Sequence, residues 1–193
     1  MRLINFIFIQ IELIIEKIYF YRLYKNENII LGEHVKIDSR AKLEITNGGK
    51  IEIGSGTVIS KGVIINTWGG EIKIGKNCLI MPYTIIYGNG GVVIGDFVGI
   101  AGHSMIVPDN HVITDVSVPI LLQGTKGSRI IIENDVWISH GCSILSGVHI
   151  SQGTVIAAGS VVNRNTSKFD IFAGVPAKRI KNRKNNFENV KNN

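Results

Sequence analysis

Cysteine, proline and aromatic residues are scarce in this chain of 193 residues. The two cysteines, Cys78 and Cys142, lie far apart and form no CxxC pair, which argues against a disulfide scaffold and against a thiolate metal site. Only four prolines are present, whereas 22 glycines recur at regular places rather than in linkers. A composition of 45% hydrophobic and 19% charged residues fits a single globular domain with a sizeable core, working in the reducing cytoplasm.

The chain also lacks an uninterrupted apolar run long enough to cross a bilayer. Residues 1–24 are the most apolar segment, yet Glu12, Glu16 and Lys17 interrupt it, and no cleavage site of a secretory signal follows. Because its polar residues fall on one side of a helical period, the segment predicts an amphipathic helix with a broad apolar face. This face either packs on the body or on a neighbouring subunit, or makes a peripheral contact with the inner membrane surface.

Positive charge exceeds negative charge, with a formal net charge of +6. Much of the excess lies near the carboxyl end, from Lys178 to Lys191. Such charge suits nucleic acid, an acidic membrane or a phosphorylated cofactor, but no RNA- or DNA-binding motif accompanies it. We therefore expect no nucleic-acid partner.

A period of six residues is the main signal in the sequence. From residue 136 the chain reads VWISHG, CSILSG, VHISQG, TVIAAG and SVVNRN. Residues two apart on a strand share a face, so each hexad predicts a short strand with two inward side chains. The glycine that closes most hexads permits the positive φ of a sharp corner. The principal inward position is held by Ile138, Ile144, Ile150, Ile156 and Val162.

The same register continues upstream in triplets that each predict one three-sided coil. The corner loops NTWGGE and GNGG absorb the residues beyond three hexads. Between Ile106 and Ile132 the register is lost, and residues 107–129 predict one long protruding loop, the natural place for function. Cys78 and Cys142 fall on inward positions, where a small buried side chain is the expected role. The triplets are Ile53, Ile59 and Ile65; Ile74, Ile80 and Ile86; Ile94, Ile100 and Ile106.

The hexads, together with NDVWIS, ILSGVHI, VIAAGSVV and FAGVPAKRI, resemble the hexapeptide-repeat acyltransferases of the left-handed β-helix class over residues 32–183. MIVPDNHVITDVSVPILLQG followed by IIIENDVWI is similar to the branch of maltose and galactoside acetyltransferases and surface-polysaccharide O-acetyltransferases. The resemblance implies an all-β, left-handed parallel β-helix that forms a homotrimer with its active sites between neighbouring prisms. We expect a helical segment at 1–31, the β-helix at 32–183 and a flexible basic tail at 184–193.

The resemblance also implies that His111, in the protruding loop, takes the proton from an acceptor hydroxyl. An imidazole titrates in the useful range for such general-base work. Either Asp115 or Asp109 is expected to orient the ring, and the sequence does not choose between them. Trp137 matches the family's WIG tryptophan near the reacting thioester, or else packs at the subunit interface. His103 is either a second histidine of the acceptor site or a wall residue.

For the cofactor, the resemblance implies acetyl-CoA as cosubstrate and no metal. His140 stands where the family commonly has a small residue, so it lines the acetyl or pantetheine pocket or points outward. The matching positions fall into three groups: Ala158 and Gly159 beside pantetheine; Asn163 and Arg164 as the polar and cationic pair that follows; Lys178, Lys181 and Arg183 near the adenosine 3′-phosphate.

The function expected is O-acetylation of a carbohydrate acceptor, a sugar hydroxyl of a surface polysaccharide (O-antigen or capsule) or its precursor. N-acetylation of an amino sugar is the nearest alternative, although the usual nucleotide-sugar enzymes of this class carry an extra domain that is not recognisable before residue 32. A free-sugar or xenobiotic acceptor and a non-catalytic hexapeptide scaffold stay open. A zinc hydratase of the γ-carbonic anhydrase type would need His103, His111 and His140 to converge, and their spacing is unhelpful.

Overall fold

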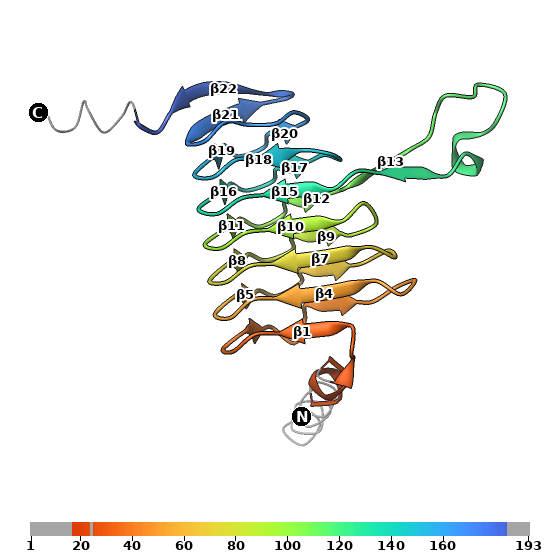
Figure 1. The fold of residues 1–193 in the computed structure, drawn as a ribbon, viewed down its shortest axis with the longest axis vertical. Helices are drawn as coiled ribbons and strands as arrows, with labels where there is room; N and C mark the ends of the chain where they lie inside the picture. Colours follow the sequence, from red (N-terminus) through yellow and green to blue (C-terminus); the bar gives the residue numbers. More distant parts are fainter. Residues whose placement is uncertain (1–16, 24, 185–193) are drawn as a thin grey trace, which may run out of the picture.

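The computed structural model describes residues 17–23 and 25–184. Short parallel strands stack into six coils of a β-helix, which rises from a helix at the amino end to a hairpin at the carboxyl end (Figure 1). Each coil contributes one strand to each of three sheets, here named A, B and C. The expected fold class, an all-β parallel β-helix with one short helix and one long loop, is confirmed.

The strands of the three sheets have the following bounds. Sheet A contains β1 (Ile29–Leu31), β4 (Lys50–Ile53), β7 (Glu71–Ile74), β10 (Val92–Ile94), β15 (Ile130–Ile132) and β18 (His149–Ile150). Sheet B contains β2 (Lys36–Ile37), β5 (Val58–Ile59), β8 (Leu79–Ile80), β11 (Gly99–Ile100), β16 (Trp137–Ile138), β19 (Val155–Ile156), β21 (Asp170–Gly174) and β22 (Ala177–Asn182). Sheet C contains β3 (Lys42–Glu44), β6 (Ile64–Asn66), β9 (Ile85–Tyr87), β12 (Met105–Ile106), β17 (Ser143–Ile144) and β20 (Val161–Val162).

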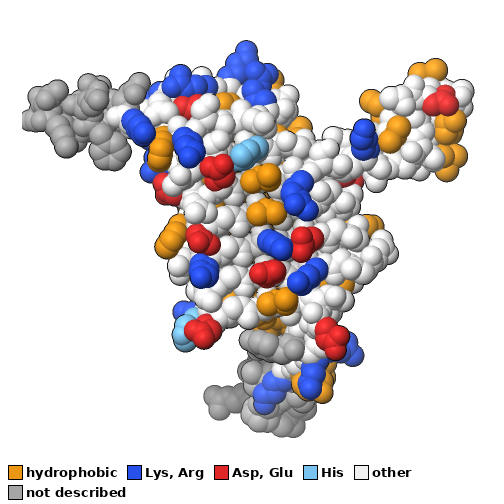
Figure 2. All heavy atoms as spheres, viewed as in Figure 1, with side chains coloured by type: hydrophobic (Ala, Val, Ile, Leu, Met, Phe, Trp, Pro, Cys, Tyr) orange, Lys and Arg blue, Asp and Glu red, His pale blue; other side chains and the backbone are white. Residues whose placement is uncertain are grey.

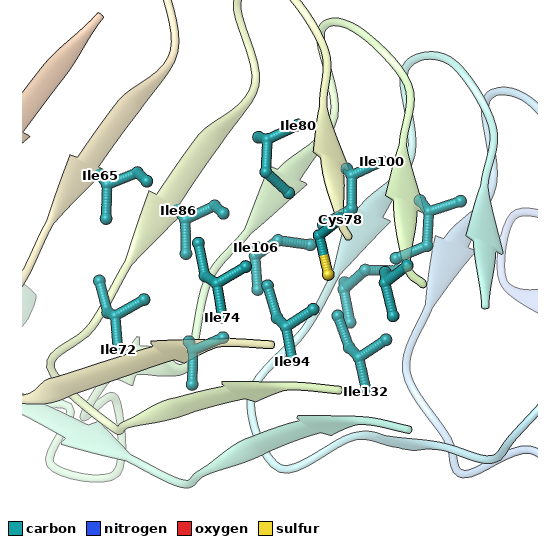
Figure 3. Packing of buried hydrophobic residues seen from close by; sticks show 14 of the residues in the cluster. Ile65, Ile72, Ile74, Cys78, Ile80, Ile86, Ile94, Ile100, Ile106 and Ile132 are labelled. Atoms are coloured by element: carbon teal, nitrogen blue, oxygen red, sulfur yellow. The ribbon is translucent and has the colours of Figure 1, made fainter. Parts of the chain in front are cut away.

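Columns of isoleucine fill the interior of the prism (Figure 3). The pairing register places Ile53 beside Ile74, Ile74 beside Ile94, and Ile94 beside Ile132, so one column continues past the long insertion. All of the inward positions predicted from the hexads are buried. Since each strand has so few residues, its stability comes from burial against the coils above and below, as in other solenoids.

The two cysteines belong to this core. Cys78 and Cys142 are free thiols with 2% and 1% of their surface exposed. Burial raises the pKa of both thiols, which leaves them protonated and poorly reactive. Their predicted role as small buried side chains is confirmed.

Three columns of turns join the sheets, here called the A/B, B/C and C/A corners. The glycines that close the C-terminal hexads have positive φ, as predicted. Gly75, at an A/B corner, has another role, because a Cβ there would lie 2.5 Å from the backbone carbon of Gly95 in the next coil. The positive-φ position of that column is instead held by Asn77, Phe97 and Asp135. Glycine therefore permits close stacking at one corner position and the sharp turn at another.

A helix covers the amino end of the prism. Residues 17–23 form a helix beneath β1, with Leu23 buried in the core and Tyr19 and Phe20 packed against it (Figure 1). Coiling begins at β1, slightly before residue 32.

The rest of the predicted amphipathic segment, residues 1–16, lies outside the described residues, as do residues 185–193 of the predicted tail. Among the described residues, no helix has the length and apolarity needed to span a membrane.

Candidate functional site

The long insertion leaves the prism between β12 and β15, at the C/A corner. It begins as a hairpin of β13 (Asp109–His111) and β14 (Thr125–Gly127), in which His111 pairs with Thr125. Pro108 anchors its base, because its carbonyl accepts hydrogen bonds from the Ser128 amide (2.8 Å) and the Ser146 hydroxyl (2.8 Å). His111 therefore stands at the end of an anchored hairpin rather than on an irregular loop.

Beyond the hairpin the insertion carries the short 3₁₀ helix η1 (Ile120–Leu122) and projects away from the body (Figures 1 and 2). Apolar side chains gather on its tip, which is drawn orange in Figure 2. The most exposed of them are Ile113, Val116, Leu121 and Leu122.

A pocket of about 590 Å³ lies where the hairpin meets the C/A corners of lower coils. Two corner turns supply aromatic and amide side chains, and the hairpin supplies the imidazole and a carboxylate. Among the described residues, the exposed His111 ring has no hydrogen-bond partner, so both ring nitrogens are available to a ligand. The lining consists of Trp68, Tyr87, Asn89, Val107, Asp109, Asn110, His111 and Thr125.

The structure distinguishes the two carboxylates considered as partners of His111. Asp109 lines the same pocket as the imidazole. The Asp115 carboxylate instead accepts hydrogen bonds from the Ser117 amide (2.9 Å) and hydroxyl (2.6 Å), which lower its pKa. Asp115 lines a separate depression near the tip with Ser117. Neither carboxylate forms a hydrogen bond with the His111 ring within the described part of the chain.

Several residues predicted to bind the cofactor meet at the B/C corner. The amide of Gly159 donates to the carbonyl of His140 at 2.9 Å, so Ala158 and Gly159 lie one coil above His140. His103 lies one coil below, with its ring 5.3 Å from that of His140. Gly141 and Gly159 both have φ of +69°, and a Cβ on either would meet no atom within 4 Å. We call this open surface over Gly141 and Gly159 the glycine shelf.

Trp137 lies on the outer face of β16 and is exposed. A Cβ on Gly99, one coil below, would lie 2.5 Å from the indole ring, so the glycine makes room for it. Trp137 is therefore on sheet B, two residues before the turn that contains His140. His111 is on the opposite side of the prism, at the C/A corner, and one protomer does not bring these residues into one pocket.

The basic residues are distributed over all three corners. Lys178, on exposed β22, lies near the B/C corner, because the amide of Gly174 in the adjoining turn donates to Ser160 at 3.1 Å. Asn163 and Arg164 are exposed at the C/A corner, and Lys181 is exposed toward the A/B end of β22. The guanidinium of Arg183 donates to the Gly153 carbonyl (2.6 Å) and the Asp135 carboxylate (3.2 Å).

The glycine shelf fits the acetyl-CoA that the sequence resemblance implies. Glycines at the same position of two successive corners leave the open strip that a pantetheine arm needs, and Lys178 is exposed on β22, near the same corner. Asn163, Arg164, Lys181 and Arg183 lie at other corners of the same protomer. No cluster of three or more metal-ligating side chains occurs within residues 17–23 and 25–184.

Three pocket residues lie outside the predicted loop and were not predicted: Trp68, Tyr87 and Asn89. They lie on the NTWGGE and GNGG corner loops or directly before one, and the sequence shows these loops one coil apart. Equivalent corners of successive coils stack, and the insertion leaves the prism at the same corner. The register of the repeats could therefore have predicted that these three residues lie close to His111.

Comparisons with known proteins agree with the hexapeptide repeat and the fold. The family described as bacterial transferase hexapeptide (six repeats) matches residues 129–164. Rv3034c of Mycobacterium tuberculosis, named as an acetyltransferase, is 29% identical over 83% of this chain and 52% of its own length. WbbJ of Escherichia coli, named as a lipopolysaccharide biosynthesis O-acetyl transferase, is 29% identical over 71% of this chain and 74% of its own. The chain thus spans about half the length of the first relative.

A solved structure shows the same fold with its ligands. A variant of AntD, an N-acyltransferase from Bacillus cereus in complex with dTDP and coenzyme A, superposes with a TM-score of 0.70 at 27% identity. The superposition covers 84% of this chain and 88% of that one. Repeat, coil architecture and relatives agree: the chain carries the bacterial transferase hexapeptide repeat and has the fold of the hexapeptide-repeat acyltransferases.

Proposed function

We propose that this protein is an O-acetyltransferase that moves the acetyl group of acetyl-CoA to a sugar hydroxyl of a surface polysaccharide, O-antigen or capsule, or of its precursor. The observation that carries the proposal is the position of His111: a ring without protein partners, on an anchored hairpin, facing a pocket lined by aromatic and amide groups. The relatives support it, because their names join acyl transfer with sugar-related acceptors.

Acetyl-CoA supplies the acetyl group as an activated thioester. The imidazole of His111 accepts the proton of the acceptor hydroxyl as its oxygen attacks the acetyl carbon, a contribution of about 10²- to 10⁴-fold for a positioned general base. The C–S bond of the thioester then breaks, and the imidazolium returns the proton to the sulfur of the departing coenzyme A. We assign the orienting role to Asp109, because it shares the pocket whereas Ser117 holds Asp115. The orienting carboxylate fixes the tautomer that leaves a ring nitrogen free to accept.

The proposed active unit is a homotrimer. The His111 pocket lies at the C/A corner and the glycine shelf at the B/C corner, so a neighbouring prism has to supply the second half of each site. Exposed apolar side chains on the tip of the insertion support this arrangement, because Leu121 is 81% and Leu122 76% exposed in the single chain. Contiguous apolar surface of this kind is normally covered by a partner.

N-acylation of an amino sugar is the second candidate, and the likeness to AntD favours it. An amine free of its proton attacks a thioester without a strong base, whereas a hydroxyl needs one. O-acylation therefore predicts a large dependence on His111, and N-acylation a small one. The product also differs, because mild alkali removes an acetyl ester and leaves an acetamide intact.

The test is mass spectrometry of the surface glycans of the producing cell, with His111→Ala beside the native protein. We expect loss of one alkali-labile acetyl group per repeat unit. Thr114→Ala, an exposed change in the same insertion, is the matched control and should leave acetylation intact. Unchanged acetylation in His111→Ala would remove this histidine from the mechanism, and alkali-stable acetyl groups would favour the N-acyl alternative.

A further inference from the structure

Two aromatic rings line the same pocket as His111. Trp68 and Tyr87 come from C/A corners of successive coils, with ring centroids 6.2 Å apart at an interplanar angle of 75°. Trp68 is 52% exposed. A large indole that folding leaves half in water contributes little to the core and is accessible to a ligand in the pocket that it lines.

The backbone at Trp68 makes this choice of residue costly. The first three corners of this column read TNGG at 46–49, TWGG at 67–70 and GNGG at 88–91, so tryptophan stands where the other two have asparagine. Asn47 has φ of +52° and Trp68 has φ of +43°. The left-handed region tolerates asparagine, whereas a bulky residue there costs about 1–2 kcal/mol.

A polar network holds the strained turn in place. The amide of Trp68 donates to the Thr46 hydroxyl (2.9 Å) and the Asn66 side-chain oxygen (3.0 Å). Asn66 in turn donates to Glu44 at 2.7 Å and accepts from Thr46 at 2.7 Å. The turn is therefore fixed without any contribution from the indole, which is presented to the pocket on a rigid support.

An amide beside the rings has an unused acceptor. The side-chain oxygen of Asn89 is buried and has no hydrogen-bond partner among the described residues. An unpaired buried acceptor costs about 1–3 kcal/mol, and a ligand hydroxyl removes that cost. Asn89 lines the same pocket as His111, so its amide is within reach of a ligand there.

The charged groups of the pocket lining favour an uncharged ligand over a phosphorylated one. The lining holds the carboxylate of Asp109 and the imidazole of His111, and no lysine or arginine. Phosphate groups are normally met by cations or by clustered amides. Aromatic faces, an amide and a single carboxylate suit instead the C–H face and the hydroxyl groups of an uncharged sugar ring.

We propose that Trp68 and Tyr87 form a stacking platform for an uncharged pyranose unit of the acceptor, with Asn89 binding a ring hydroxyl and the acylated hydroxyl turned toward His111. The proposal rests on the function proposed above and makes it more specific. Any phosphate or nucleotide of a precursor then lies outside this pocket. The pocket volume, about 590 Å³, is within the range of roughly 300–1,000 Å³ usual for small-molecule sites.

Direct binding tests the platform without requiring catalysis. The chain has two tryptophans, so Trp137→Phe leaves Trp68 as the single indole reporter. We would titrate this variant with repeat-unit oligosaccharides released from the surface polysaccharide of the producing strain after removal of O-acetyl groups by alkali. The expected result is a saturable change of indole fluorescence that a thymidine diphosphate sugar does not displace. No change on titration, or displacement by the nucleotide sugar, overturns the proposal.

Two matched variants separate binding from folding, with calorimetry as the readout. Trp68→Asn restores the asparagine found at residue 47, so the melting temperature should stay equal or rise while oligosaccharide affinity falls roughly tenfold or more, as for loss of an aromatic anchor. Phe97→Asn makes the same change at an A/B corner, where Phe97 has φ of +57° and is 64% exposed, and should leave affinity unchanged.

These binding measurements can be interpreted whether or not the proposed acetyl transfer is correct. His111→Ala should lose acetyl transfer and still show saturable binding of the oligosaccharide through Trp68, with a loss of affinity no larger than that expected for one hydrogen bond. If Trp68→Asn binds normally while transfer to the oligosaccharide continues, the platform is wrong and the proposed function stands. If the oligosaccharide binds through Trp68 but receives no acetyl group, the platform stands and the proposed function fails.

Discussion

Replacing Gly159 by alanine adds one methyl group to the glycine shelf. At φ of +69° the alanine backbone is strained, which costs about 1–2 kcal/mol of folding free energy. The methyl group itself meets no atom within 4 Å, so it clashes with nothing in the free protein and points to open space. If pantetheine lies on the shelf, the methyl group overpacks that contact by about 1–3 kcal/mol. The Kd for coenzyme A should then rise about 5- to 150-fold.

The matched control is Gly147→Ala at the C/A corner. Its φ is +78° and the nearest atom to an added Cβ, that of Ser128, lies at 3.4 Å, so backbone strain is nearly the same and the space is adequate. Both variants should lose similar stability in thermal unfolding, about 2–4 °C for each kcal/mol in a chain of this size. Calorimetric titration with coenzyme A should show weaker binding for Gly159→Ala alone. Equal affinities for the two variants would refute the placement of the cofactor on this corner.

Three further changes test the core, the thiols and the insertion. Ile100→Ala removes a fully buried side chain from the middle of the column and should lower the free energy of unfolding in urea by about 2–5 kcal/mol. Because burial raises the pKa of the Cys78 and Cys142 thiols, both should react slowly with a disulfide reagent in the folded protein, and both at once after denaturation. Leu121→Asp places a charge on the exposed apolar tip and, if the tip forms the contacts of the proposed trimer, should shift the protein toward monomer in light scattering.

The sequence predicts the parts of this structure that periodic burial controls. An inward side chain every six residues has to be small or aliphatic, since it packs on its equivalents above and below. The register of Ile94 with Ile132, across the insertion, therefore follows from the pattern alone. For the same reason, Cys78 could be assigned to the core.

The contacts of exposed polar groups could not be predicted in this way. Arg183 matches a cofactor position by resemblance, yet in the structure it binds the carbonyl of Gly153 and the carboxylate of Asp135. Asp115 is similarly engaged by Ser117. The six-residue period constrains the inward side chains, but it does not determine which hydrogen-bond partner an outward side chain has. The Trp68 position was missed for a related reason, because the corner loops were interpreted only as breaks between hexads.

The stacked coils also limit how an active site can be assembled. A continuous core allows no hinge, so no internal motion can bring His111 at the C/A corner to the glycine shelf at the B/C corner. If both act in one reaction, they come from different subunits. His111→Ala and Gly159→Val should each be inactive alone, and co-expressing them should then restore about a quarter of the sites. In a symmetric trimer, each site has an even chance of receiving an intact His111 from one subunit and an even chance of receiving an intact glycine shelf from its neighbour. Activity in the mixture that stays at the level of the separate variants would show that each site lies within one chain.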